Sequence, residues 1–124
     1  MFRRMRCVVV IWLLAGCGGG GSGVDGSKAL AMVSADEQAK ICDWIASTVG
    51  GYDPGWSCAM SSYQPYGSRA TCVALFPSTC AATVGQFESC SVAALHAAKT
   101  CTAEAVNAAM QRADCMALTN CPAP

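Results

Sequence analysis

Ten cysteines in a chain of 124 residues constrain this fold more than any other feature of the sequence. So high a density in a short chain is typical of proteins that form disulfides in an oxidising compartment, or of proteins that bind metal. The spacing argues against metal, because even the closest pair, Cys115 and Cys121, is separated by five residues. Zinc, iron–sulfur and haem sites usually contain Cys-x-x-Cys pairs, and none occurs here. We therefore expect disulfides, with no bound metal and no cofactor.

The first 16 residues have the features of an export signal. Three arginines lie within the first six residues, and an apolar run of nine residues follows from Cys7 to Ala15. This run is too short to span a bilayer, which needs about 20 apolar residues, but it has the length of a signal-peptide core. We therefore assign residues 1–16 to a signal peptide.

The signal leads into Leu14-Ala15-Gly16-Cys17, which resembles the lipobox of bacterial lipoproteins. The resemblance implies that a diacylglyceryl group is attached to the Cys17 thiol, that a peptidase cuts before Cys17, and that the new amino group is acylated. Two or three acyl chains are sufficient for stable membrane anchoring. The next residue is Gly18 rather than Asp, which by resemblance to the sorting rule of enteric bacteria implies the outer membrane. The expected location is the cell envelope, with the membrane face left open.

Residues 17–33 are expected to be a lipidated cysteine followed by a flexible linker. Five of the six residues from 18 to 23 are Gly, and such a stretch behaves as a flexible tether. Its r.m.s. reach is roughly 20–25 Å for residues 18–33, from about 5–6 Å × √n. We therefore expect the folded part to float near the membrane.

Residues 34–124 are predicted to form an all-α, disulfide-stapled domain with one long loop. Ser34 with Glu37, and Thr83 with Gln86, have the spacing of capping boxes at helix starts. Apolar residues at helical spacing follow both, and alanine, a strong helix former, is abundant. No alternating run is long enough to indicate a strand. Helices are expected over 35–49, 69–76 and 84–99, and from about residue 102.

The cysteines of this domain form an even set, and we expect four disulfides among Cys42, Cys58, Cys72, Cys80, Cys90, Cys101, Cys115 and Cys121. The sequence leaves their pairing open. Cys90 and Cys101 would lie about 16 Å apart along one helix, too far for a disulfide, which needs Cα atoms within about 7 Å. Cys42 is expected to reach a later helix, for instance at Cys90, and Cys72 with Cys80 would close a short loop.

Residues 50–68 are expected to form a loop, because Gly, Pro, Ser and Asp dominate them. Four aromatic residues in this loop form a candidate binding surface: Tyr52, Trp56, Tyr63 and Tyr66. Tyr and Trp supply contact area at low entropic cost and are enriched at binding hot spots. The alternative is that these rings fold back and complete a small core that is otherwise built from Ala.

The charged and polar residues disfavour several functions. Without the signal, five basic and eight acidic residues remain, a net charge of −3, so we expect no nucleic-acid partner. His96, the single histidine, has no carboxylate three or four residues away to orient it as a general base, and we expect it to be exposed. No phosphate loop or nucleophile elbow occurs, and no carboxylate pair stands out for acid–base work. We therefore expect no catalytic residues and no enzyme.

These features favour a non-enzymatic, membrane-anchored binding module of the cell envelope, whose partner is an envelope protein or glycan. Beyond the lipobox, the Gly-rich tether and the helical, Cys-rich remainder resemble small cysteine-rich lipoproteins of unknown function. That resemblance implies no catalytic motif. The alternatives are a disulfide-rich inhibitor that inserts the 50–68 loop into an envelope enzyme, or an enzyme built around His96 or a carboxylate cluster.

Overall fold

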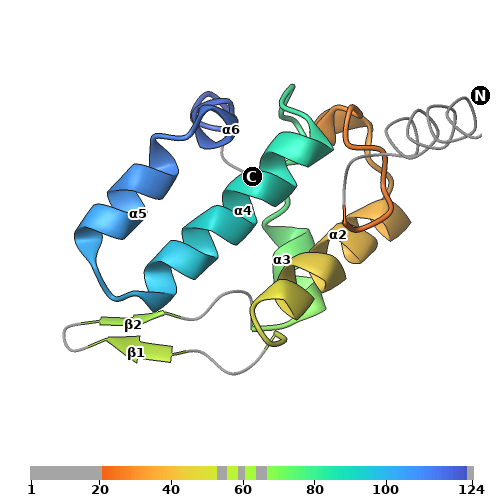
Figure 1. The fold of residues 1–124 in the computed structure, drawn as a ribbon. Coiled ribbons are helices and arrows are strands. Elements are labelled where there is room, and N and C mark those ends of the chain that lie inside the picture. The colour runs from red at the N-terminus through yellow and green to blue at the C-terminus, as the bar shows by residue number, and fades with distance from the viewer. Residues whose placement is uncertain (1–20, 53–55, 59–60, 64–66, 123–124) are drawn as a thin grey trace, which may run out of the picture.

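The computed structural model describes residues 21–52, 56–58, 61–63 and 67–122, with 56–58 and 61–63 described by their backbone. The predicted signal peptide and Cys17 lie outside the described residues. Helices dominate this part of the chain and pack around the long helix α4, which confirms the predicted all-α, disulfide-stapled fold (Figure 1). The elements are, in chain order, η1 (Leu30–Met32), α2 (Ala35–Thr48), β1 (Trp56–Cys58), β2 (Ser61–Tyr63), α3 (Arg69–Ala74), α4 (Val84–Lys99), α5 (Ala103–Met110) and α6 (Ala113–Met116).

The two longest helices begin at the predicted capping boxes. At α2, the Ser34 hydroxyl accepts from the Glu37 N–H at 3.2 Å, and the Glu37 carboxylate accepts from the Ser34 N–H at 3.1 Å. Thr83 and Gln86 make the same reciprocal bonds at α4. Each box satisfies N–H groups that the first turn of a helix leaves unpaired, so the sequence fixes both helix starts.

Two glycines end α2. Gly50 and Gly51 have φ angles of 100° and 120°, which cost Gly little and other residues much. The Gly51 N–H bonds to the Ala46 carbonyl at 2.8 Å and so satisfies one of the last acceptors of the helix. The chain turns away from α2 where the Gly-Gly pair predicts.

The core lies between α2 and α4, and α3 packs on α2. Ile41 and Ile45 of α2 are fully buried, as is Val84 at the start of α4. Phe76, after α3, meets Phe87 of α4 edge to face, with 5.1 Å between ring centroids. Such aromatic pairs add a directional attraction to the burial of apolar area. The two rings thereby connect the α2–α3 pair to α4.

The segment before α2 is part of the domain, contrary to the prediction of a flexible linker up to residue 33. We call residues 21–33 the N-terminal strap. Val24 is 3% exposed and Leu30 is fully buried, and both belong to the core cluster. The predicted domain boundary at residue 34 is therefore wrong. Because glycines surround them, the few apolar residues of the strap that pack into the core form no recognisable sequence pattern.

Backbone hydrogen bonds tie the N-terminal strap to the segment that leads into α4. Lys28 of the strap also forms an ion pair with Glu37 of α2, 2.8 Å from nitrogen to oxygen. The strap therefore joins α2 to α4. The four backbone bonds run from the Leu30 N–H to the Ala82 carbonyl, Ala31 to Cys80, Val84 to Lys28 and Gly85 to Gly26.

The predicted loop contains a short antiparallel hairpin, β1–β2, which the sequence did not indicate. Its register places Trp56 opposite Tyr63 and Ser57 opposite Ser62. Each strand has three residues, too few for the alternating pattern by which strands are recognised in sequences. In Figure 1 the hairpin lies toward the end of the molecule where α4 meets α5, away from the strap.

Three disulfides join distant segments of the described fold, and Cys101 is disulfide-bonded as well. The side chain of Cys58 lies outside the described residues. The expected links from Cys42 to Cys90 and from Cys72 to Cys80 are wrong, because α3 packs on α2 and brings Cys72 to Cys42. The exclusion of a Cys90–Cys101 bridge is confirmed. The pairs are Cys42–Cys72, Cys80–Cys121 and Cys90–Cys115, with Cα–Cα distances of 6.0, 4.9 and 4.8 Å.

Candidate functional site: the hairpin clamp

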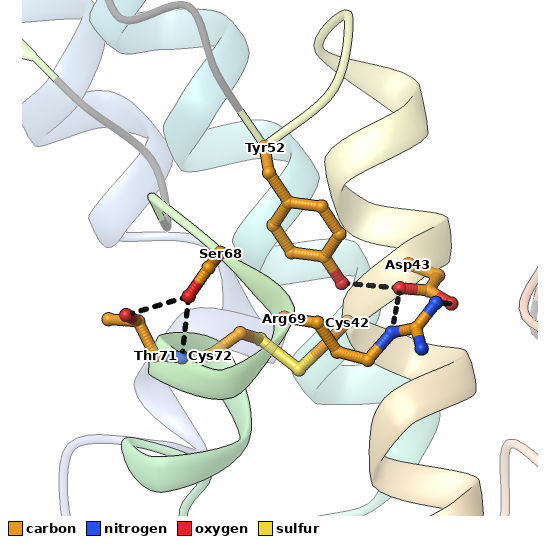
Figure 2. Close-up of a disulfide and its surroundings, with 7 residues drawn as sticks. All are labelled: Cys42, Asp43, Tyr52, Ser68, Arg69, Thr71 and Cys72. Carbon is orange, nitrogen blue, oxygen red and sulfur yellow. Dashed lines mark hydrogen bonds and ion pairs between the residues drawn. A yellow bond between two sulfur atoms is a disulfide. The ribbon is translucent and has the colours of Figure 1, made fainter.

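One carboxylate of α2 holds both ends of the segment that carries the hairpin. The Tyr52 hydroxyl, just before the hairpin segment, donates to Asp43 Oδ1 at 2.6 Å. Arg69, just after that segment, donates from Nε to Oδ1 at 2.8 Å and from Nη2 to Oδ2 at 2.7 Å. Figure 2 shows the phenol and the guanidinium directed at the same carboxylate. We call Asp43, Tyr52 and Arg69 the hairpin clamp.

Local structure places the clamp residues. Ser68 caps α3 by accepting from the Thr71 N–H at 3.1 Å, and this fixes Arg69 as the first residue of the helix. The Cys42–Cys72 disulfide joins the same two helices, next to Asp43 and one helical turn from Arg69 (Figure 2). The covalent bond and the ion pair therefore hold α2 and α3 in one arrangement.

The electrostatics of the clamp keep its side chains in the protonation states that their hydrogen bonds require. Hydrogen bonds from Arg69, and then from Tyr52, hold the pKa of Asp43 below its usual range. Burial, followed by the hydrogen bond to Asp43, raises the pKa of Tyr52 to about 12. At neutral pH the carboxylate is ionised and the phenol keeps the proton that it donates. These three groups bind one another, so the arrangement positions the hairpin and does not activate a nucleophile.

The structure places three of the four predicted binding residues. Tyr52 folds back, half buried, and packs against the core, as the alternative interpretation expected. Trp56 and Tyr63 are cross-strand partners on β1 and β2. Tyr66 lies outside the described residues. Sequence reasoning did not find Asp43 and Arg69, because 26 residues separate them and only the fold brings them together.

His96 lies exposed on α4, as predicted, and its ring contacts the end of α2. Its Nε2 is 3.3 Å from the Thr48 carbonyl, and the Lys99 ammonium donates to the Val49 carbonyl at 3.0 Å. The acceptors are the last residue of α2 and its C-cap, where basic groups interact favourably with unpaired carbonyls. The two side chains thus cap one helix from another.

Glu88 of α4 is a buried acid that the sequence did not single out. It is 2% exposed, and the Ser22 hydroxyl of the N-terminal strap donates to its carboxylate. Burial raises the pKa of Glu88, and the hydrogen bond from Ser22 opposes part of that effect. The sequence could not predict this contact, because 66 residues separate Ser22 from Glu88.

The described residues offer little else for ligand chemistry. Among them, no group of three or more His, Cys, Asp or Glu residues could hold a metal ion. An open hollow of about 530 Å³ is lined by Gln86, Arg112, Ala113 and Asp114. Its charged groups already pair with each other, since Arg112 Nη2 lies 3.0 Å from Asp114 Oδ2.

No helix within the described ranges is long and apolar enough to cross a membrane. No protein-family model matches the chain, and comparisons with curated proteins and with solved structures gave no match.

Proposed function

We propose that this protein is a lipid-anchored, non-enzymatic binding module of the cell envelope, which presents the β1–β2 hairpin to an envelope protein or glycan. The observation that carries the proposal is the hairpin clamp. Asp43 fixes both ends of the hairpin segment on α2, so the segment has less freedom to lose when a partner binds. Pre-organisation of this kind improves affinity by reducing the cost of ordering.

The proposed anchor is the acylated Cys17, in the outer membrane. The lipobox at Leu14 to Cys17 is its basis in the sequence. Disulfides between α2 and α3 and between α4 and α6 support export, because structural disulfides form and persist in oxidising compartments.

The proposed contact residues are Trp56 and Tyr63, which the register places directly opposite each other, with Tyr66 shortly after them in the chain. Aromatic rings can stack on sugars or fill pockets in a protein partner, and such residues dominate binding energies when they lie at the centre of an interface. Tyr52 is not among them, because its ring and hydroxyl serve the clamp.

Photo-crosslinking in cells tests the binding surface. A photoreactive phenylalanine analogue replaces Tyr63 in the full chain, and in a matched control it replaces Gln111, an exposed residue at the end of α5. We expect a discrete crosslinked product from position 63, which disappears with Trp56→Ala, and none from position 111. Equal products from both positions, or none from position 63, would contradict binding through the hairpin.

Mass spectrometry of the protein purified from cells tests the anchor. We expect a mature chain that begins at Cys17 and carries a diacylglyceryl group and an amide-linked acyl chain. Cys17→Ser should remain unprocessed and without lipid. A native mature chain without lipid would contradict the proposal.

The clamp also favours the second candidate function, a disulfide-rich inhibitor that inserts its hairpin into an envelope enzyme. A rigid insert binds an active site at low entropic cost. If the partner crosslinked to position 63 is a hydrolase, its activity should fall when the purified protein is added, and Trp56→Ala should relieve the inhibition.

A further inference from the structure

The N-terminal strap shortens the lipid tether, and this limits how the domain can face the membrane. We infer that in the lipidated protein the end of the domain that carries the strap lies against the lipid surface, with the hairpin facing away from it. The inference rests on the proposed lipidation of Cys17.

The strap is packed almost from its first described residue. Gly21 lies against the indole of Trp44 so closely that a Cβ at this position would overlap the ring. Ser22 bonds to the buried Glu88, and Val24 is 3% exposed. The tether is therefore the short stretch from Cys17 to Gly21, and not the whole Gly-rich segment up to residue 33.

The length of this stretch sets the distance between lipid and protein. Residues 17 to 21 span four peptide units, and at 3.8 Å between consecutive Cα atoms their full extension is about 15 Å. Acyl chains on Cys17 keep that residue at the headgroup boundary. Gly21, and with it the Trp44 side of the domain, is consequently held within about 15 Å of the lipid surface.

The strap is not free to supply more length. Its release would expose Val24 and Leu30, break the Lys28–Glu37 ion pair and remove the hydrogen bond of Ser22 to a buried carboxyl. The backbone bonds to the segment before α4 would be lost as well. The docked strap therefore acts as a fixed attachment.

The β1–β2 strands lie away from the body of the strap. Figure 1 shows the strap toward the beginning of α4 and the hairpin toward its end. α4 has 16 residues and so spans about 24 Å. The strap and the start of α2 carry charges of both signs, so the tether and not electrostatic attraction sets the orientation, which should be insensitive to salt. These charged residues are Asp25, Lys28, Asp36, Glu37 and Lys40.

Energy transfer from tryptophan to lipid tests the orientation. The mature chain would keep two tryptophans, Trp44 on α2 and Trp56 on β1, because Trp12 leaves with the signal. The lipidated full chain is incorporated into phosphatidylcholine vesicles that contain a headgroup-labelled dansyl lipid. Because the tether holds Gly21 and the adjoining Trp44 within about 15 Å of the lipid, we expect Trp56→Phe, which leaves Trp44, to show about twofold or more greater transfer than Trp44→Phe.

A longer tether provides the matched control, and it retains the half-buried Trp44. In the Trp56→Phe protein, an insert of about 20 Gly and Ser residues after Gly18 adds roughly 25 Å of reach. Transfer from Trp44 should then fall by about half or more, while added salt should leave it unchanged in either protein. Equal transfer from the two tryptophans, or transfer from Trp44 that ignores the insert, would overturn the inference.

The two proposals fail in different ways. A mature chain without lipid, by mass spectrometry, contradicts the proposed function. A lipidated chain with equal transfer from Trp44 and Trp56 contradicts the orientation alone.

Discussion

Asp43 accepts every hydrogen bond of the hairpin clamp, so its replacement should release the hairpin segment. Asp43→Asn keeps the size of the side chain and removes the charge that Arg69 pairs with. The Asp43 side chain is 41% exposed, so the cost in global stability should be about 1 kcal/mol or less. The segment between residues 53 and 67 should open more often, and we expect limited proteolysis within it to become several-fold faster.

Asp114→Asn is the matched control for this prediction, since it removes another arginine–carboxylate pair, with Arg112, within the turn that begins α6. It should leave cleavage between residues 53 and 67 unchanged.

The pKa of Asp43 is lowered, so the clamp stabilises the fold fully above the ordinary Asp pKa, about 3.9, and this stabilisation disappears as the pH falls through the lowered value. Unchanged cleavage of Asp43→Asn near pH 7 would show that the clamp does not hold the segment.

The buried Glu88 has the opposite dependence on pH. Because burial raises its pKa, the folded state resists an ionisation that the unfolded state makes freely above about pH 4.3. Glu88→Gln removes this penalty and keeps an acceptor for the Ser22 hydroxyl. We expect the variant to melt a few degrees higher than the native protein near pH 7, and at the same temperature below about pH 4.

Thermal melts across this pH range, with Glu104→Gln as control, measure the effect. Glu104 is exposed on α5, so its replacement removes a surface carboxylate in place of a buried one. A Glu88→Gln variant no more stable than the native protein near pH 7 would mean that the folded state tolerates the charge, for instance by opening the strap.

Elements with strong local signals were predictable from the sequence, and elements held by distant contacts were not. α2 and α4 each combine a capping box with an apolar stripe, so their starts follow from neighbouring residues. The N-terminal strap has only three buried apolar residues, and its backbone hydrogen bonds to the rest of the domain run to residues 80–85. The hairpin strands are likewise too short to show a period.

Gly85→Ala tests how tightly the strap docks on α4. Alanine favours a helix over glycine by about 1 kcal/mol. A Cβ at this position would, however, lie 3.1 Å from the Gly26 carbonyl, which accepts the Gly85 N–H at 2.9 Å. The strap backbone must therefore move, and we expect faster hydrogen exchange at the amides of residues 84 and 85 with no net gain in stability.

Ser89→Ala is the control for helix propensity, because Ser89 is exposed on α4. It should leave exchange at residues 84 and 85 unchanged and raise stability slightly. If Gly85→Ala behaves like Ser89→Ala, the strap is loose enough to accommodate a methyl group.

For the whole molecule, the number of cysteines predicts a stapled fold, but the pairing depends on which helices pack together. Cys72 meets Cys42 because α3 folds back onto α2, and Cys90 meets Cys115 because α6 returns to α4. The same packing created the clamp, whose members are too far apart in sequence to form a motif. Local patterns thus specify the helices, and tertiary contacts specify the site.

The Cys80–Cys121 bridge tests how far the molecule depends on its staples. It closes a loop of 41 residues, and the chain-entropy model gives it about 4 kcal/mol at 25 °C. Cys80→Ala with Cys121→Ala removes the bond without placing a hydroxyl at the buried position 80. Since small domains have about 5–15 kcal/mol of stability in total, we expect a large shift of the urea midpoint, with the helical signal retained in water.

Under strong reductant the native protein and the variant should reach the same stability and lose their helical signal together, because the remaining bridges open in both. A variant as stable as the native protein before reduction, or a reduced native protein that keeps its helices, would show that the apolar core between α2 and α4 suffices without disulfides.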